Sequence, residues 1–190
     1  MTSNSNDLVS RRQLLGAFAG VTMITAAPRF AKAASYNRGA GKIRQFHMKN
    51  QRTGETINTI YWIDGEYIKP SLEEINYFMR DWRTDQVKDI DLRTVDIMAA
   101  AHNLLDVNEP YMLLSGYRSA ATNAMLRRRS RRVAKNSLHI KGQAADLRLS
   151  SRSVSQVARA AAACRAGGVG RYSRSNFVHM DCGVVRTWGG

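Results

Sequence analysis

Two histidines and an aspartate in this sequence have the types and spacing of a metal site. His139 and Asp146 lie seven residues apart in Ser-Leu-His-Ile-Lys-Gly-Gln-Ala-Ala-Asp, residues 137–146. His179 follows in Asn-Phe-Val-His-Met-Asp, residues 176–181. Two imidazole nitrogens and one carboxylate oxygen suit Zn²⁺, which keeps a fourth position for water when the protein provides three ligands. Because zinc lowers the pKa of bound water to about 7, this set predicts hydrolytic chemistry.

An acid is expected beside this centre. Residues two apart on a strand project from the same face, so Asp181 should lie next to His179. Its carboxylate either accepts a proton as general base or orients His179 through the second ring nitrogen.

The other histidines and the cysteines are not expected to bind the metal. His47 has no ligand-type neighbours, and His102 falls on a predicted helix, where a structural role is expected. Cys182 follows Asp181 on the same strand and should point away from the metal face. Cys164 and Cys182 either form a disulfide, which an oxidising compartment permits, or remain buried thiols.

The N-terminus has the layout of an export signal. Ser-Arg-Arg-Gln-Leu-Leu, residues 10–15, precedes a small and apolar run that ends at Ala27, and Ala-Lys-Ala follows at residues 31–33. The apolar run is shorter than the roughly 20 residues of a membrane-spanning helix. This order is typical of a twin-arginine signal removed near Ala33, with a short amphipathic helix as the alternative. We therefore expect a periplasmic protein with no membrane span after signal removal.

Length and charge predict one basic domain. A chain of 190 residues can bury a single core. We expect residues 1–33 to be the signal, residues 34–55 a linker and residues 56–190 the folded domain. The signal carries four basic residues and one acid, so its removal lowers the formal net charge from +14 to +11. Such a charge attracts polyanions, but export and the lack of aromatic residues among the basic ones disfavour nucleic acid.

The hydrophobic pattern predicts an α+β domain. Alternation around the turn dipeptide Asp64-Gly65 predicts a β-hairpin over residues 56–68. A capping box at Ser71 and Glu74 is expected to start a helix that runs to Trp82. Further helices are predicted at 91–107, 120–129 and 154–166, and further strands at 111–114, 144–149, 177–182 and 184–188. Their irregular order predicts an antiparallel sheet with flanking helices.

A cluster of arginines precedes the first candidate ligand, His139. The run Arg-Arg-Arg-Ser-Arg-Arg, residues 127–132, either draws anionic cell-wall polymer toward the cleft or is a solvated loop.

Taken together, these motifs resemble the zinc peptidases of the D-alanyl-D-alanine carboxypeptidase-like group. The resemblance rests on Ser-x-His-x-x-Gly-x-Ala-x-Asp at residues 137–146, with Ser-Gly-Tyr-Arg-Ser before it and His179 after it. It covers residues from about 42 to the C-terminus and implies a Hedgehog/DD-peptidase fold. Within the group, the twin-arginine leader and the Phe-Val-His-x-Asp ending are most similar to the murein endopeptidases.

The resemblance also implies roles for individual residues. The implied zinc ligands are His139, Asp146 and His179. Arg118, in Ser-Gly-Tyr-Arg-Ser, is implied to steady the substrate carbonyl as negative charge develops on it; the alternative is an arginine that only caps a turn or pairs with an acid. Carboxypeptidase relatives carry a glutamate base three residues before the last histidine, where this chain has Asn176. An amide cannot accept the proton, so the base is expected to be Asp181 or an unidentified acid.

The expected function is hydrolysis of the peptide cross-links between peptidoglycan stem peptides. The resemblance points to the bond that joins two diaminopimelate residues. Two alternatives remain open. One is a D-alanyl-D-alanine or L,D-carboxypeptidase of the same fold, and the other is a non-catalytic, zinc-containing peptidoglycan-binding module.

Overall fold

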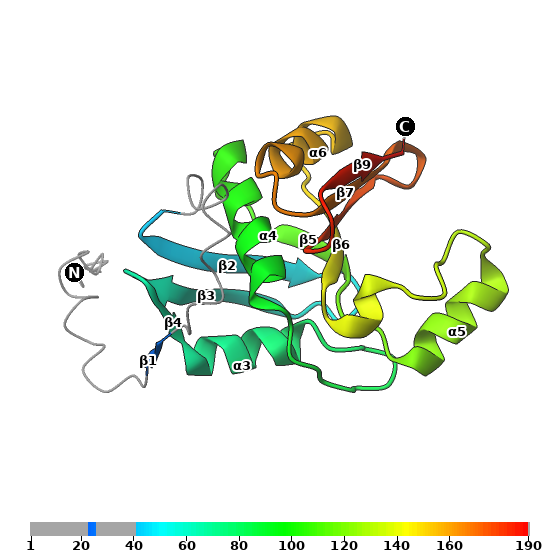
Figure 1. Ribbon diagram of the computed structural model, residues 1–190, viewed down its shortest axis with the longest axis horizontal. Helices are drawn as coiled ribbons and strands as arrows, with labels where there is room; N and C mark the ends of the chain where they lie inside the picture. The colour runs from blue at the N-terminus through cyan, green and yellow to red at the C-terminus, as the bar shows by residue number, and fades with distance from the viewer. Residues whose placement is uncertain (1–22, 26–40, 190) are drawn as a thin grey trace, which may run out of the picture.

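The computed structural model describes residues 23–25 and 41–189, which form one mixed sheet with helices packed on it (Figure 1). The strand order is β1-β4-β3-β2-β5-β6-β8-β7-β9. The strands are β1 (Met23–Thr25), β2 (Ile43–Asn50), β3 (Thr56–Ile63), β4 (Glu66–Ile68), β5 (Tyr111–Ser115), β6 (Ala144–Arg148), β7 (Gly168–Tyr172), β8 (Phe177–Asp181) and β9 (Arg186–Trp188). The helices are α3 (Lys69–Phe78), α4 (Leu92–Leu105), α5 (Ala120–Arg129) and α6 (Val154–Ala163), with short 3₁₀ helices η2 (Leu138–Lys141) and η3 (Ser173–Ser175).

The α+β fold and the hairpin around Asp64-Gly65 are confirmed. The sheet is antiparallel except where β2 pairs with β5 and β7 pairs with β9. No helix within the described ranges is long and apolar enough to cross a membrane. The predicted signal peptide, residues 1–33, lies outside the described residues except for Met23–Thr25.

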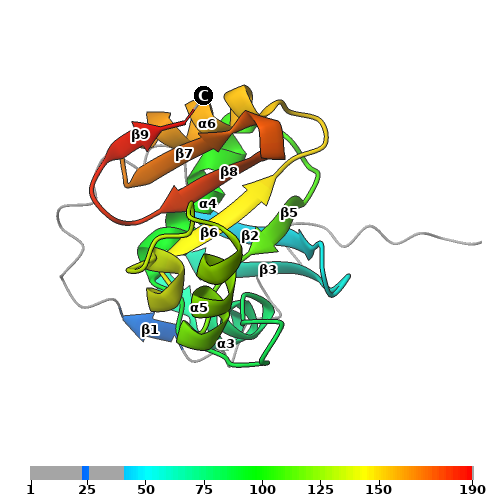
Figure 2. The same ribbon diagram turned by 90° about the vertical axis from the view of Figure 1, so that its right-hand side faces the viewer.

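Helices α3, α4 and α6 share one hydrophobic core with the sheet. Phe46 of β2 packs edge-on against Phe78 of α3, with ring centroids 6.2 Å apart. Tyr61 of β3 donates a hydrogen bond to Asp96 of α4 at 2.9 Å. Figure 2, turned by 90° from Figure 1, shows β6, β7, β8 and β9 in front, with α4 and α6 behind them. Helices α4 and α6 therefore cover one face of this half of the sheet, and the other face, which we call the open face, carries the short helix η2.

Side-chain alternation places the candidate ligands on this open face. Val178 and Met180 of β8 are buried in the core, so His179 between them projects the other way. Asp146 lies between two core residues of β6 in the same manner. The antiparallel register of β6 and β8 sets Asp146 directly opposite His179.

The folded domain begins before the predicted boundary. Residues 34–55 were expected as a linker, but Ile43–Asn50 within them form strand β2. Every second residue of this strand is buried, from Arg44 to Asn50. The interspersed charged and polar side chains conceal the alternation in the sequence, because the aliphatic parts of such residues can still cover a core.

Helix α3 starts two residues earlier than the predicted capping box. Its N-cap is Ile68, with no side-chain cap, and Pro70 occupies the first turn. Proline suits this position, because its fixed φ matches the helix and its missing N–H needs no partner there. The Ser71–Glu74 capping box is therefore wrong.

Strand β7 was not predicted, because its glycines weaken the strand pattern. A Cβ on Gly168 would lie 2.5 Å from Asp181 Oδ2, and one on Gly170 would lie 2.6 Å from the Trp188 ring. Glycine is therefore needed here for the close approach of an acid and an indole to the backbone. The predicted helix 154–166 ends at Ala163, and this strand begins at Gly168.

Hydrogen bonds to a buried acid hold the segment that carries Arg118. Asp81 is 1% exposed and accepts hydrogen bonds from the backbone N–H groups of Ser119 and Arg83, at 2.9 and 3.1 Å. Burial by itself would raise the pKa of Asp81, but hydrogen bonds from Thr122, Ser119 and Arg83 outweigh it and lower the pKa.

We expect Asp81→Asn to lower the free energy of unfolding by about 1–3 kcal/mol at pH 7, because buried donors lose a charged acceptor. A carboxyl whose pKa is lowered by folding contributes stability above its unfolded pKa and loses it as pH falls through the folded value. The difference in free energy of unfolding between wild type and variant, measured by urea denaturation, should therefore decrease below about pH 4. Asp85→Asn, at an exposed acid of the same loop, is the control, and a pH-independent difference would contradict the assignment.

Candidate metal centre

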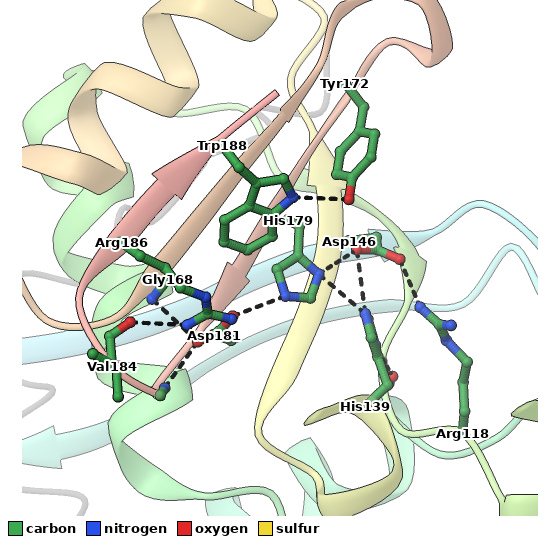
Figure 3. A network of polar contacts seen from close by, with 12 residues as sticks. Arg118, His139, Asp146, Gly168, Tyr172, His179, Asp181, Val184, Arg186 and Trp188 are labelled. Atoms are coloured by element: carbon green, nitrogen blue, oxygen red, sulfur yellow. Dashed lines mark hydrogen bonds and ion pairs between the residues drawn. The ribbon is translucent and has the colours of Figure 1, made fainter. Parts of the chain in front are cut away.

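Three side chains distant in sequence converge on the open face of the sheet. His139 comes from η2, Asp146 from β6 and His179 from β8 (Figure 3). Each offers one ligand atom, and these atoms all lie within 4.8 Å of one another. The structure thus brings together the three residues that the sequence proposed as metal ligands.

The spacing of the ligand atoms fits a tetrahedral zinc site. His139 Nε2 lies 3.3 Å from His179 Nδ1 and 3.2 Å from Asp146 Oδ1. His179 Nδ1 lies 2.8 Å from Asp146 Oδ1. Tetrahedral bonds of about 2.0–2.1 Å separate neighbouring ligand atoms by about 3.3–3.4 Å. The two distances from His139 match this separation. The distance between His179 and Asp146 is shorter, as expected where a histidine N–H donates a hydrogen bond to a carboxylate.

His139 is held in one tautomer by the backbone. Its Nδ1 donates to the carbonyl of Gly116 at 2.8 Å, which leaves the Nε2 lone pair directed at the other two ligands. The ring is 1% exposed. Gly116 itself cannot carry a side chain, since a Cβ there would lie 2.5 Å from the carbonyl oxygen of Met79.

Gly142 ends the η2 turn that carries His139. Its φ is +69°, a left-handed conformation that favours glycine, and its carbonyl accepts a hydrogen bond from the N–H of Asp91 at 2.9 Å. An added Cβ would lie 2.6 Å from the carbonyl oxygen of Asp89. The sequence analysis marked the surrounding motif, and the tertiary contact shows why this position needs glycine.

We expect Gly142→Ala to be more destabilising than Gly54→Ala. Both positions have positive φ, which costs a residue with Cβ about 1–2 kcal/mol. Gly54 has open space around it, whereas Gly142 meets Asp89, which adds about 1–3 kcal/mol. Chemical denaturation of the two variants measures the difference, and equal losses would show that the Asp89 contact relaxes freely.

Asp146 is oriented by Arg118. Arg118 Nη2 donates to Asp146 Oδ2 at 2.9 Å, and its Nε donates to Ser115 Oγ at 2.9 Å. This leaves Asp146 Oδ1 directed at the two imidazoles. Arg118 also reaches η2, because its backbone N–H donates to the carbonyl of His139 at 3.2 Å.

The His179 ring forms a hydrogen bond on the side that faces away from the other ligands. Asp181 Oδ2 accepts from His179 Nε2 at 3.1 Å, so Asp181 lies behind the imidazole (Figure 3). Asp181 is fully buried, and both its oxygens accept from Arg186, at 3.2 and 2.8 Å. The N–H groups of Gly168 and Gly183 also donate to it, at 3.1 and 2.9 Å. Of the two roles expected for Asp181, this position favours orientation of His179 over proton abstraction.

The electrostatic balance of the cluster favours a bound cation. Burial lowers the pKa of His139, which keeps this ring neutral. Burial also opposes the charged form of His179, but Asp146 and Asp181 outweigh it and raise its pKa to about 9. The two imidazoles hold the pKa of Asp146 well below its ordinary value despite burial. Two carboxylates around one imidazole thus create a place for positive charge, which a divalent metal would also satisfy.

A hollow of about 330 Å³ opens over the three ligand atoms. Arg118, Tyr172 and Ser137 contribute to its lining, together with the ligands themselves. Asp146 is the only carboxylate among the described residues that line it. A substrate in the hollow would therefore meet hydrogen-bond donors and one candidate metal position, and no carboxylate other than Asp146 among the described lining residues.

The residues expected to stay outside the centre do so. His102 Nε2 donates to the carbonyl of Glu109 at 2.8 Å and its ring packs against Tyr111, which is a structural role. Cys182 packs in the core, and both cysteines are buried free thiols. His47 lies on β2.

Sequence reasoning missed Arg186 and Trp188, which support His179. Arg186 binds Asp181, and its guanidinium lies 4.8 Å from the Trp188 ring centroid. The Trp188 ring lies 5.4 Å from that of His179. The available signal was an arginine and a tryptophan two residues apart on the last predicted strand, which places both on one face.

Comparison with protein families identifies this arrangement of residues. Residues 38–188 match the family described as peptidoglycan L,D-endopeptidase MepK. The chain belongs to this family. MepK of Escherichia coli K12 is 41% identical over 182 residues, which cover 94% of this chain and 97% of that protein. The probable MepK of Haemophilus influenzae is 41% identical over 150 residues, 78% of this chain and 81% of that protein.

Membership of the MepK family accounts for the extent of the domain. The matched region begins at residue 38, before strand β2, and ends at Trp188, the last residue of β9. It therefore includes both the strand that the sequence analysis missed and the indole beside His179. The family is one of peptidases, in agreement with the peptidase fold that the motifs implied.

We expect Asp181→Asn to weaken zinc binding by about 10–100-fold, because the amide no longer fixes the tautomer and direction of His179. Competition with a chelator measures this affinity. If Asp181 were instead the general base, the variant would keep zinc affinity and lose turnover. Asp89→Asn, at an exposed acid whose carboxylate accepts from Asn76 and, within the described residues, forms no hydrogen bond with the three ligands, is the control.

Proposed function

We propose that this protein is a zinc-dependent peptidoglycan endopeptidase that hydrolyses peptide cross-links between stem peptides. The observation that carries the proposal is the convergence of His139, Asp146 and His179 at tetrahedral spacing in a chain of the MepK family. Its relatives are named peptidoglycan L,D-endopeptidases, so the bond between two diaminopimelate residues is the proposed target.

His139, Asp146 and His179 would hold Zn²⁺, which when bound supplies a water of lowered pKa and polarises a carbonyl. The remaining chemistry belongs to the protein side chains. Arg118 has five N–H groups, and its bonds to Ser115 and Asp146 engage two nitrogens. Arg118 lines the hollow, where a fixed guanidinium stabilises an oxyanion more than a neutral carbonyl.

Asp181 is assigned to the orientation of His179 rather than to proton transfer. Its two oxygens are engaged by Arg186, His179 and two backbone N–H groups. Burial would raise the pKa of Asp181, but bonds from His179 and Arg186 lower it to about 2, which makes this carboxylate a weak base. Its place in the mechanism is to keep the His179 ring aligned.

The site of action would be the periplasm. The paired arginines, the apolar run and the small residues near Ala33 support export by the twin-arginine pathway, with residues 1–33 removed. Peptidoglycan-directed relatives agree with such a location. The mature protein keeps a large positive charge, which suits an anionic cell wall.

The deciding experiment incubates the zinc-loaded protein with cross-linked muropeptide dimers of known linkage. Conversion of dimers joined through two diaminopimelate residues to monomers, detected by mass, is the expected result. Release of terminal D-alanine from monomers instead would indicate the carboxypeptidase alternative. Full zinc content with neither reaction would indicate the binding module.

We expect His139→Ala and Asp146→Ala each to lose stoichiometric zinc and all measurable dimer cleavage. Removal of zinc by a chelator should abolish cleavage in the wild type, and added zinc should restore it. Elemental analysis and the dimer assay measure both effects. His102→Ala, at a structural histidine outside the centre, should retain zinc, and cleavage by zinc-free protein would overturn the proposed metal dependence.

A further inference from the structure

The hollow over the candidate metal centre continues into a second hollow of about 280 Å³. Arg132, Tyr172 and Ser175 line both, so the two hollows adjoin. Arg174 also lines the second hollow. We call Arg132 and Arg174 the arginine groove.

The positive charge of this groove is not neutralised by nearby acids. Asp146 is the only acidic residue between Ser119 and Met180, and it already binds Arg118. In the part of the chain that the structure describes, no salt bridge joins the arginine groove to an acidic side chain. Arg132 and Arg174 are exposed, whereas Arg171 points to the helix-covered face of the sheet, where its Nη1 donates to Ser155 Oγ of α6 at 3.4 Å.

An aromatic residue, Tyr172, lines both hollows, as Arg132 does. The Tyr172 ring stacks on Phe177, with centroids 4.5 Å apart and planes at 11°. Its hydroxyl accepts from Trp188 Nε1 at 3.0 Å, as Figure 3 shows. Contacts with β8 and β9 therefore fix the position of Tyr172 beside the two hollows.

The chemistry of the proposed substrate complements such a groove. Diaminopimelate has two amino and two carboxyl groups, so a cross-link through one amino group leaves a carboxylate on the same carbon as the linked nitrogen. This carboxylate is adjacent to the scissile bond and would be carried into the site with it. Guanidinium groups bind carboxylates by paired, charge-assisted hydrogen bonds.

We infer that the arginine groove binds the free carboxylate next to the scissile bond and so selects cross-links made through diaminopimelate. The inference rests on the proposed function and adds the feature of the substrate that is recognised. It also gives a role to Arg132, the last arginine of the run at residues 127–132. The other arginines of that run are outside both hollows.

The test compares two pairs of probes that differ only in amidation of this carboxyl. One pair is the cross-linked dimer, and the other is its diaminopimelate-containing product peptide. The zinc-loaded wild type should bind the free-acid product roughly tenfold more tightly than the amide, by calorimetric titration. It should also show a correspondingly lower KM for the free-acid dimer, with little change in kcat.

The double variant Arg132→Ala, Arg174→Ala should abolish the preference for the free acid in both assays. The double variant Arg128→Ala, Arg131→Ala, at two exposed arginines outside both hollows, controls for the loss of two charges and should keep the preference. Arg132→Lys, Arg174→Lys should restore part of it. Equal melting temperatures would exclude misfolding of the variants.

Equal binding of acid and amide by the wild type would overturn the inference, as would a preference that survives in the alanine variant. These outcomes leave the proposed function intact if both dimers are still cleaved. Absence of cleavage would instead contradict the proposed function. The product titration would still decide whether the arginine groove binds the carboxylate.

Discussion

The antiparallel register that sets Asp146 of β6 opposite His179 of β8 is the constraint on which the candidate site depends. It brings a carboxylate and an imidazole to 2.8 Å on the open face of the sheet, and η2 then needs to supply only His139. A shift of one residue in this pairing would turn Asp146 or His179 into the core. The buried neighbours of both residues in the same strands therefore protect the site as well as the fold.

Each candidate ligand is held by a second group that has its own support. Gly116 orients His139, Arg118 orients Asp146, and Asp181 orients His179. Such outer contacts fix the donor atoms before an ion arrives, so less ordering remains to oppose binding. The arrangement also explains the glycines around it, because carbonyl and carboxylate oxygens approach the backbone where a Cβ would collide.

Charge is distributed unevenly over the open face. The centre contains two carboxylates beside the imidazoles, while within the described ranges the arginines that line the hollow form no salt bridge except that of Arg118 with Asp146. The centre at the bottom of the hollow thus favours a cation, and the arginines along the wall of the hollow favour a negatively charged substrate. The same chain can attract both because buried groups a few ångströms apart interact strongly, whereas exposed arginines act mainly on what approaches from solvent.

The sequence by itself determined the α+β class, most helices and strands, and the three candidate ligands, because these follow from local periodicity and from the chemistry of side chains. Only the tertiary structure decided that β2 belongs to the sheet, that Asp181 lies behind His179, and that Arg186 and Trp188 support it. These facts depend on strand order and on which neighbour fills each space. Hydrophobic pattern fixes the face of a strand, but the partner across that face comes from distant parts of the chain.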